Sequence, residues 1–442
     1  MHSRGVHRFA VLAAIATLGL LGIGGLVTSH GAGMAVPDWP NTYGYNMFFF
    51  PVSYWVGGVF YEHTHRLAAS GVGLLTVVLA LWLYGRSARP LMRWGGLVLM
   101  LAGLFIPVAA RRPWNDGVVV GLTGLAGFVT SSFWPSCEAS PKWLRWCGVA
   151  ALVAVILQGV LGGLRVVLLK DALGIFHATV AQLYFALVCA IAFCTSRWWE
   201  TPPGRLPSTL HNRLFNCFLL TTLLILGQLT LGAAMRHQHA GLAIPDFPLA
   251  YGKLWPAMDA ASVAHYNAQR MEVTNVNPIT ASQILLQMVH RLLALTILGA
   301  VAFSAWFARR SLGRQERLSR LALVWLGLIL TQGLLGAATV WSNKAADVAT
   351  AHVVVGALAL ALGVLLSIIS SREVTWRQSQ LAPLGGRGEP AAYSPSPLPS
   401  SLGRGSLIAS GFARRARQVS SRNWLRFSPS PKESASVREH FQ

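Results

Sequence analysis

Charged side chains are scarce in this 442-residue chain, where Asp, Glu, Lys and Arg make up 12% of the residues and hydrophobic residues make up 53%. The mean hydropathy is correspondingly high, at +0.49. A water-soluble domain needs more polar surface than this. The composition therefore excludes an ordinary soluble protein and predicts a polytopic membrane protein.

Acidic residues are the rarer charge, with 15 Asp and Glu against 36 Lys and Arg and a formal net charge of +21. Such an excess can indicate nucleic-acid binding. Here, however, Lys and Arg lie mainly in short loops between apolar runs and near the C-terminus. This distribution is typical of membrane topology, so we expect a lipid bilayer and no nucleic acid as partner.

Cysteine is also sparse, and none of the five cysteines has C-x-x-C spacing. This absence argues against a metal–thiolate cluster. None lies in the two long loops, 29–64 and 236–288, that carry several histidines. A disulfide within either loop is therefore excluded.

Ten apolar stretches approach the length of about 20 residues that a helix needs to cross a bilayer. They lie at 9–28, 66–84, 91–110, 117–134, 146–165, 174–195, 214–235, 289–308, 319–339 and 351–371. Loops 85–93, 196–213 and 309–318 share one side and are rich in Arg. The positive-inside rule makes that side cytoplasmic, with both termini on it and the histidine-bearing loops outside.

The N-terminus is basic from Met1 to Arg8 and leads directly into the first apolar stretch. No small-residue cleavage site follows, so we interpret this segment as a signal anchor that stays as the first span. It contains no long presequence rich in Arg and Ser. We therefore expect the bacterial plasma (inner) membrane rather than the mitochondrial inner membrane.

Two motifs each occur twice, in the same order. A G-x-x-x-P-D-aromatic-P loop stands at 33–40 and 241–248, and a Q-G-x-L-G segment begins at Gln158 and again at Gln332. Each half also has a span that opens with His-Arg and a later span that opens with a single His. This internal repeat predicts an all-α fold of two pseudo-symmetric four-helix bundles, within 1–212 and 213–371.

The first half is the longer one. His65 and His177 are 112 residues apart, whereas His290 and His352 are 62 apart. The extra residues hold two apolar runs, so we expect an additional helical hairpin at about 91–134, which leaves every later loop on its original side. Residues 372–442 are rich in Pro, Gly and Ser, and we expect a disordered cytoplasmic tail there.

Four histidines occupy matched places in the repeat. Each begins a span that runs from outside to inside, so all four are expected at similar depth: His65, His177, His290 and His352. Two imidazoles from facing helices can hold a haem iron from both sides. A single histidine at a membrane interface can equally be a hydrogen-bonding or anchoring residue. The remaining outer-loop histidines lack matched partners and are interpreted as loop residues, with copper binding left open: His30, His63, His237, His239 and His265.

The residues around these histidines differ between the halves at one informative position. Glu62 precedes His65 by three residues and shares its helical face, whereas Gln287 stands at the matched place before His290. A carboxylate there can move protons or stabilise positive charge on a substrate, or it can merely hydrogen-bond a ligand histidine. Arg66 and Arg291, next to the histidines, can pair with haem propionates, or they can cap loops or meet lipid headgroups.

At these residues the sequence resembles the haem A synthase family. The resemblance runs from about Gly24 to about Ser370, leaves out 91–134, and rests on the P-D-W-P loop, Glu62-x-x-His65-Arg66, the Q-G-x-L-G segments and the three later histidines. It implies an oxidoreductase of haem biosynthesis and cytochrome oxidase assembly, which oxidises a ring methyl of haem O to the formyl group of haem A.

The resemblance also implies roles for single residues. His65 and His177 would flank the substrate haem O, Glu62 would be the catalytic carboxylate, and His290 and His352 would bind the iron of a haem b. Haem O synthase, cytochrome oxidase and further copies of this chain are candidate partners. Many members carry a cysteine pair in the first outer loop, which this sequence lacks between Ser29 and Thr64.

Two other functions are compatible with parts of the pattern. A two-haem b-type electron-transfer protein needs the same four histidines, but it gives no reason for Glu62 opposite Gln287. A transporter built from repeated halves would place polar residues at broken helices near the midplane. Here they cluster at the outer mouth, which counts against transport.

Overall fold

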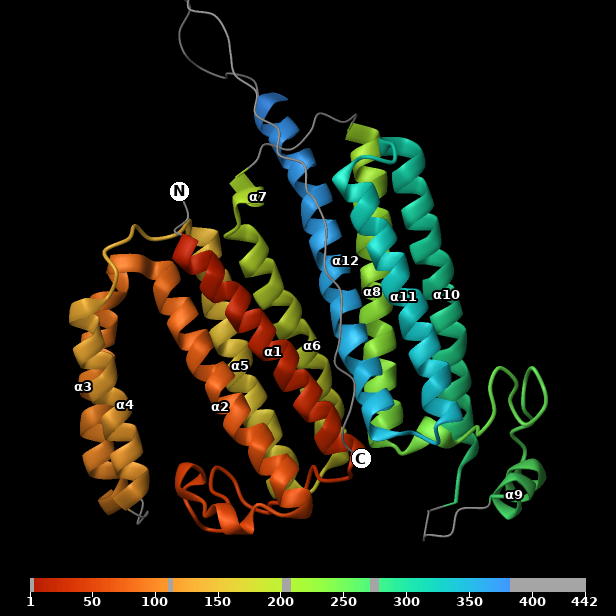
Figure 1. The fold of residues 1–442 in the computed structure, drawn as a ribbon, viewed down its shortest axis with the longest axis horizontal. Helices are drawn as coiled ribbons and strands as arrows, with labels where there is room; N and C mark the ends of the chain where they lie inside the picture. Colours follow the sequence, from red (N-terminus) through yellow and green to blue (C-terminus); the bar gives the residue numbers. More distant parts are fainter. Residues whose placement is uncertain (1–3, 110–113, 201–207, 271–277, 382–442) are drawn as a thin grey trace, which may run out of the picture. The chain divides into compact units, whose positions relative to one another are not determined.

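The computed structural model describes residues 4–109, 114–200, 208–270 and 278–381, and over these ranges the chain is helical without a β-strand (Figure 1). The α-helices are α1 (Arg4–Ser29), α2 (Gly57–Tyr84), α3 (Ala88–Ala109), α4 (Trp114–Phe133), α5 (Lys142–Leu168), α6 (Asp171–Cys194), α7 (Arg197–Glu200), α8 (Ser208–His237), α9 (Ala260–Ala268), α10 (Ala281–Leu312), α11 (Arg317–Trp341) and α12 (Ala346–Leu381). The expected all-α polytopic membrane protein is confirmed. Of the expected tail at 372–442, the residues beyond 381 lie outside the described ranges, while α12 itself continues past residue 371 to Leu381.

In the described ranges, nine helical stretches are long and apolar enough to cross a membrane. One of them, Gly57–Ala109, has 53 residues and contains both α2 and α3, which the sequence analysis counted as two spans. As a straight helix it would be about 80 Å long, far more than a bilayer needs. The chain instead turns at Gly85, whose φ is +56° and where a Cβ would collide with the Cys137 carbonyl.

Helices α1, α2, α5 and α6 form a closed circuit in which each packs on the next and α6 packs back on α1; we call it the first bundle. Its core contains the buried side chains of Leu79, Leu83, Leu144, Val188 and Ile191. Because the circuit runs in this order, α2 and α6 lie across the bundle from each other. These are the helices that carry His65 and His177.

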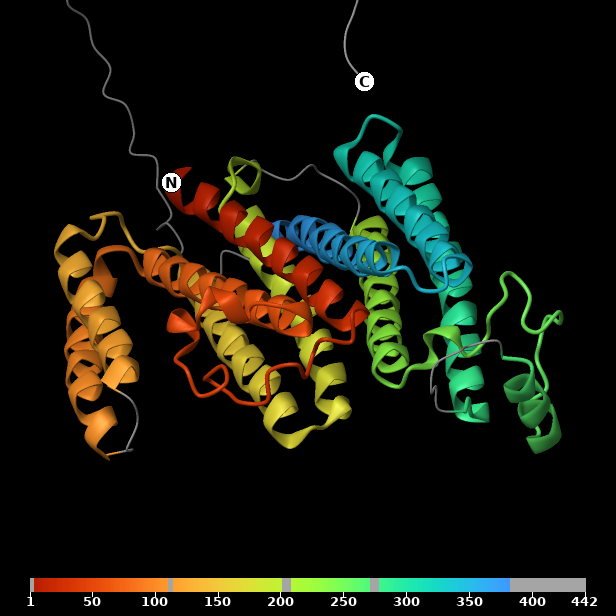
Figure 2. The same cartoon turned by 60° about the horizontal axis from the view of Figure 1, so that its bottom comes forward.

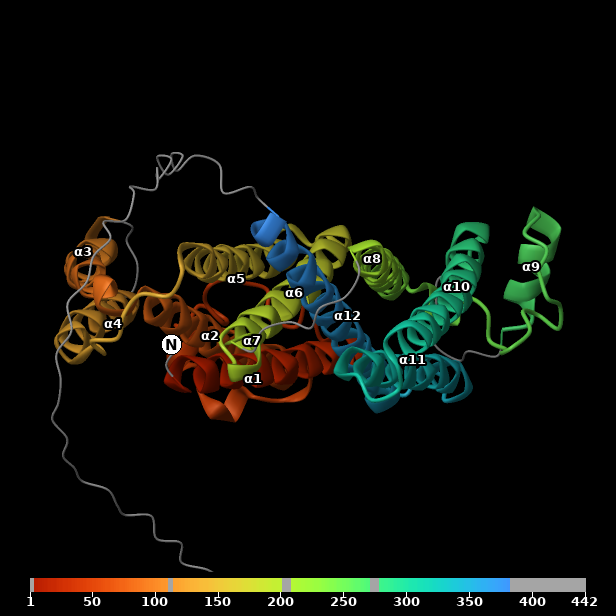
Figure 3. The same cartoon turned by 90° about the horizontal axis from the view of Figure 1, so that it is seen from above.

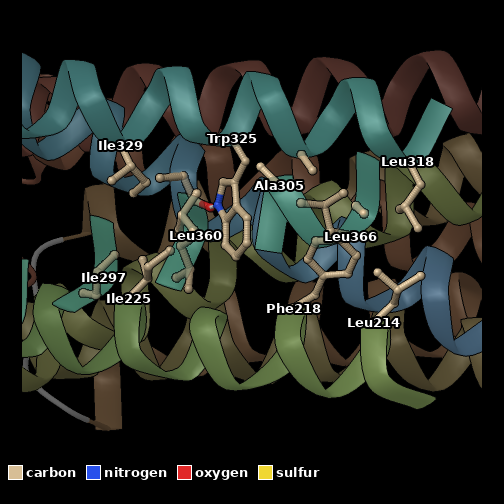
Figure 4. Packing of buried hydrophobic residues seen from close by; sticks show 14 of the residues in the cluster. Leu214, Phe218, Ile225, Ile297, Ala305, Leu318, Trp325, Ile329, Leu360 and Leu366 are labelled. Atoms are coloured by element: carbon tan, nitrogen blue, oxygen red, sulfur yellow. Dashed lines mark hydrogen bonds between the residues drawn. The ribbon is translucent and has the colours of Figure 1, made fainter. Parts of the chain in front are cut away.

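Helices α8, α10, α11 and α12 form a second closed circuit, the second bundle, in which α10 and α12 lie across from each other. Trp325 is fully buried in its core among Phe218, Leu360 and Leu366, and its indole donates to the Ala359 carbonyl at 2.8 Å (Figure 4). That bond satisfies the one polar group of a large side chain in an apolar interior.

The two bundles contact each other through α1 and α6 on one side and α8 and α12 on the other (Figures 2 and 3). Small buried residues such as Ala357 and Ala361 face Phe185 at this contact. Small side chains allow membrane helices to approach closely where no water drives association.

Helices α3 and α4 form the hairpin predicted at about 91–134, and they pack mainly on each other. Glycines make this close approach possible. A Cβ at Gly117 would collide with the Gly103 carbonyl oxygen, and a Cβ at Gly124 would lie 2.5 Å from the Gly96 carbonyl oxygen. The hairpin is tied to the loop between α1 and α2 by the Asn46 amide, which donates to Asp116 at 2.8 Å.

Candidate functional site

The two long loops with the P-D-aromatic-P motif fold in the same way. Asp38 accepts the backbone N–H groups of Tyr43 and Gly44, both at 2.7 Å, and Asp246 accepts those of Tyr251 at 2.7 Å and Gly252 at 2.9 Å. Both motifs contain a cis peptide bond before their last proline. These aspartates thus stabilise turns, and their carboxylates face the loop backbone.

Glu62 and Gln287 fasten these loops to their helices through matched hydrogen bonds. Glu62 is 4% exposed and accepts the Val36 N–H at 2.9 Å, while Gln287 is 2% exposed and accepts the Ile244 N–H at 2.7 Å. Val36 and Ile244 occupy the same place in the two motifs. The two side chains therefore share one position and one structural role, and they differ in charge.

Arg66 and Arg291 hold the same loops. Arg66 donates through Nη1 to the Asp38 carbonyl at 2.7 Å and through Nη2 to Glu62 at 2.6 Å. Arg291 donates to the carbonyls of Leu249 at 2.9 Å and Asp246 at 2.7 Å. Loop capping, one of the two roles considered for these arginines, accounts for these contacts, and pairing with haem propionates stays a prediction.

The four matched histidines form two pairs. His65 on α2 and His177 on α6 interact electrostatically across the first bundle, and His290 on α10 and His352 on α12 do so across the second. Of the described His, Cys, Asp and Glu side chains, no three come together as a site for a metal ion would require. Two imidazoles on facing helices fit a haem iron instead, because such an iron needs only two ligands from the protein.

Each of the four imidazoles lies against a glycine of a neighbouring helix. An ideal Cβ at Gly24 would be 3.1 Å from Cε1 of His65, and at Gly162 it would be 3.3 Å from Cε1 of His177. The same construction gives 3.4 Å from Gly232 to His290 and 3.2 Å from Gly336 to His352. A Cβ at Gly24, Gly162 or Gly336 would push the ring by a few tenths of an ångström, whereas one at Gly232 would just touch it.

The four histidines share a ring nitrogen without a partner in the described ranges, whereas the glutamines around them make different contacts in the two halves. Nδ1 of all four imidazoles is buried and has no hydrogen-bond partner among the described residues. Gln158 donates to the His177 carbonyl at 3.0 Å, and Gln228 donates to the His290 carbonyl at 2.9 Å. Gln332 contacts Nε2 of His352 at 3.3 Å, and iron at that nitrogen would displace the amide.

These observations fit a haem held between two histidines in each bundle. Buried imidazole nitrogens without partners cost free energy unless a ligand takes one of them and water or backbone takes the other. Trp39 lies on Gly163, directly beside the glycine that supports the His177 ring. Trp39 is partly exposed, and whether it covers a cofactor pocket stays a prediction.

His63, adjacent to His65 in sequence, packs into the loop between α1 and α2. It is fully buried, lies 3.2 Å from the Thr42 hydroxyl through Nδ1, and its ring centroid is 4.7 Å from that of Trp55. It therefore supports the loop, as expected for a histidine without a counterpart in the second half.

Arg165 and Arg236 were not singled out from the sequence, although both lie close to the histidine pairs. Arg165 interacts electrostatically with His65 and His177 and lies 3.5 Å from Asp171. Arg236 interacts with His352. The available signal was their place near the end of an otherwise apolar helix, where an arginine is costly and usually functional.

Comparison with known proteins gives two matches. A model of the family described as Cytochrome oxidase assembly protein (COX15-CtaA) matches residues 114–364, which include His177, His290 and His352 but not Glu62 or His65. The matched region begins at α4, although we expected residues up to 134 to lie outside the shared pattern.

A protein named Heme A synthase from Beijerinckia indica subsp. indica is similar in sequence. It is 27% identical to this chain over 282 residues, which are 63% of the chain and 62% of the relative. The chain thus matches somewhat less than two thirds of that relative's length.

Proposed function

The chain belongs to the cytochrome oxidase assembly protein family (COX15-CtaA), whose model covers more than half of it, and from this premise we propose that it is a haem A synthase. In this proposal it oxidises a ring methyl of haem O to a formyl group and supplies haem A to terminal oxidases. The named relative and the two histidine pairs support the proposal.

In the proposed reaction the two bundles have different tasks. His65 and His177 hold the substrate haem O in the first bundle, and His290 and His352 hold a resident haem b in the second. Oxidising an unreactive methyl C–H bond requires the iron and oxygen chemistry that haem supplies. The bundle orients the ring, and the Gly24 and Gly162 supports set the rotation of the two imidazoles.

The observation that carries this division is the difference between Glu62 and Gln287 at otherwise matched sites. Both accept the same loop N–H, so geometry alone does not require an acid at residue 62. An ionised carboxylate beside His65 can accept a proton or stabilise positive charge as substrate carbon is oxidised, whereas an amide cannot. Arg66 holds the carboxylate in place at 2.6 Å.

A two-haem electron-transfer protein is the second candidate. The observation that favours it is that Glu62 is tied to the Val36 N–H and to Arg66, as a purely structural residue would be. In that case the chain would carry electrons between two haems and leave both chemically unchanged.

Expression of the full chain in bacterial cells that make haem O, but have no haem A synthase of their own, separates the candidates. Pigment extraction and mass analysis should find haem A or hydroxylated haem O. Haem-loaded protein that yields only unmodified haem would refute the synthase and leave the electron carrier.

The cellular setting is part of the same proposal. The Arg-rich loops and both termini lie on the cytoplasmic side of a bacterial plasma membrane, and the sites open outward. Reporter fusions test this orientation, with a reporter that is active only in the cytoplasm. One fusion is made at residue 313, between α10 and α11, and the other at residue 255, in the second outer loop. Activity at 255 and none at 313 would reverse it.

A further inference from the structure

Arg236 and Lys344 are two cations at the end of the second bundle where α8 ends and α12 begins. Arg236 lies in the last turn of α8, and Lys344 lies in the loop between α11 and α12 with a left-handed backbone, at φ +65°. Both are half-buried, and they interact electrostatically. Arg236 lies one helical turn beyond Gly232, the glycine against the His290 ring, and it is also close enough to His352 to interact with it electrostatically.

Neither cation has a counter-charge within the described ranges. They belong to neither of the close ion pairs Glu62–Arg66 and Arg165–Asp171, and no acidic group of the described residues acts on the electrostatics of either cation. Arg236 bonds through Nη2 to the Gly25 carbonyl at 2.6 Å and to the Ser29 hydroxyl, while its Nε is buried without a partner. Burial, followed by the charge of Arg236, lowers the pKa of Lys344. Two like charges in such a place are costly unless an anion joins them.

The arginine that the sequence offered as an anion partner is already engaged. Arg291 uses both terminal nitrogens on the carbonyls of Leu249 and Asp246, and it lies over the Phe247 ring at 5.4 Å. Arg236 also has no equivalent in the first half. Arg236 follows Gly232, the glycine against His290, by four residues. The matching glycine in the first half is Gly24, and the residue four positions after it is Thr28.

We propose that Arg236 and Lys344 bind a carboxylate of the tetrapyrrole held by His290 and His352. This inference rests on the proposed haem b site and names two of its contacts. A guanidinium and an ammonium on one carboxylate give charge-assisted hydrogen bonds, and they supply the anion that both side chains lack. The carboxylate also fixes the rotation of the ring about the axis through the two histidines.

The test compares two porphyrins in the full-length chain carrying His65→Ala, so that the second pair alone is titrated. The probes are iron protoporphyrin IX and its dimethyl ester, which has the same ring but no carboxylate. Binding is followed by the absorption of the bis-imidazole iron. The ester should bind on the order of tenfold more weakly than the acid, the effect of one charge-assisted contact.

Lys344→Gln and Arg236→Gln should each bring this acid-to-ester ratio toward one, largely by weakening the acid. Lys253→Gln removes an exposed cation from the loop between α8 and α10 and should leave the acid-to-ester ratio unchanged. Lys344→Gln is the decisive variant, because Arg236 also packs α8 on α1 and its loss can disturb folding.

The outcomes are distinct. An unchanged ratio in Lys344→Gln would overturn the carboxylate site while leaving the haem b site intact. Failure of the folded His65→Ala protein to bind either porphyrin would refute the second histidine pair as a haem site, and the carboxylate site with it.

Discussion

Replacing Gly336 by alanine should weaken haem binding in the second bundle without destabilising the haem-free protein. An ideal Cβ at Gly336 lies 3.2 Å from Cε1 of His352, closer than ordinary van der Waals contact. Gly333 is three residues earlier on α11, and a Cβ there meets nothing within 4 Å. Gly333→Ala is therefore a matched control with the same change in helix propensity.

The magnitude follows from where the contact is made. Both alanines gain about 1 kcal/mol of helix propensity. In the haem-free protein the His352 ring can turn away from the new methyl group by a few tenths of an ångström. Once iron fixes the ring, that movement is blocked, and overpacking of this kind costs about 1–3 kcal/mol. Haem affinity should thus fall roughly 5- to 150-fold in Gly336→Ala.

Optical titration of the purified haem-free variants with iron protoporphyrin IX measures this effect, and thermal unfolding without haem measures the propensity gain. His65→Ala in all three proteins restricts the titration to the second pair. Equal haem affinities for Gly336→Ala and Gly333→Ala would show that the glycine behind His352 is not a support for a ligand ring, and would remove the main geometric argument for haem at this pair.

Three further outcomes are expected. Glu62→Gln should keep the loop folded and the haem b spectrum unchanged, because Gln287 makes the same bond in the second half. It should lower the rate of haem O oxidation at least a hundredfold. A variant with full activity would refute the proposed role of Glu62. Its counterpart Gln287→Glu should create no second oxidation site. His290→Ala should lose the resident haem, and a full haem b spectrum in that variant would contradict the assignment. Gly117→Val should force α3 and α4 apart and destabilise the hairpin by several kcal/mol, which increased protease sensitivity would show. Both haem absorption spectra should stay unchanged.

Much of the site could be predicted from the sequence because its chemistry is carried by rare residues in an apolar chain. The matched positions of His65, His177, His290 and His352 needed only the repeat and the lengths of the spans. The contrast of Glu62 with Gln287 was visible for the same reason. The hairpin was predicted because the first half has two extra apolar runs, and two added spans leave every later loop on its original side. Its helices lie where expected.

Contacts between distant segments could not be predicted in this way. Arg66 offered a guanidinium suited to carboxylates, and it does pair with Glu62, but its bonds to loop carbonyls 25 to 30 residues away were not predictable. Gln228 has no counterpart in the repeat, since residue 20 is Leu, and its bond to the His290 carbonyl depends on how α8 lies against α10. Arg236 and Lys344 are more than 100 residues apart and come together only where the two helix ends meet.

The sequence by itself determined that this is an all-α membrane protein. It also predicted two corresponding halves and singled out four histidines and one acid at the ends of apolar runs, because a bilayer accommodates few polar side chains and those present are usually functional. Only the tertiary structure decided that the paired histidines lie on opposite helices of a circuit, that a glycine lies behind each ring, and that Arg236 and Lys344 have no acidic partner among the described residues. These features depend on packing between helices. Small residues set the distance between neighbouring helices, and the hydrophobic periodicity of the sequence does not reveal which of them do so.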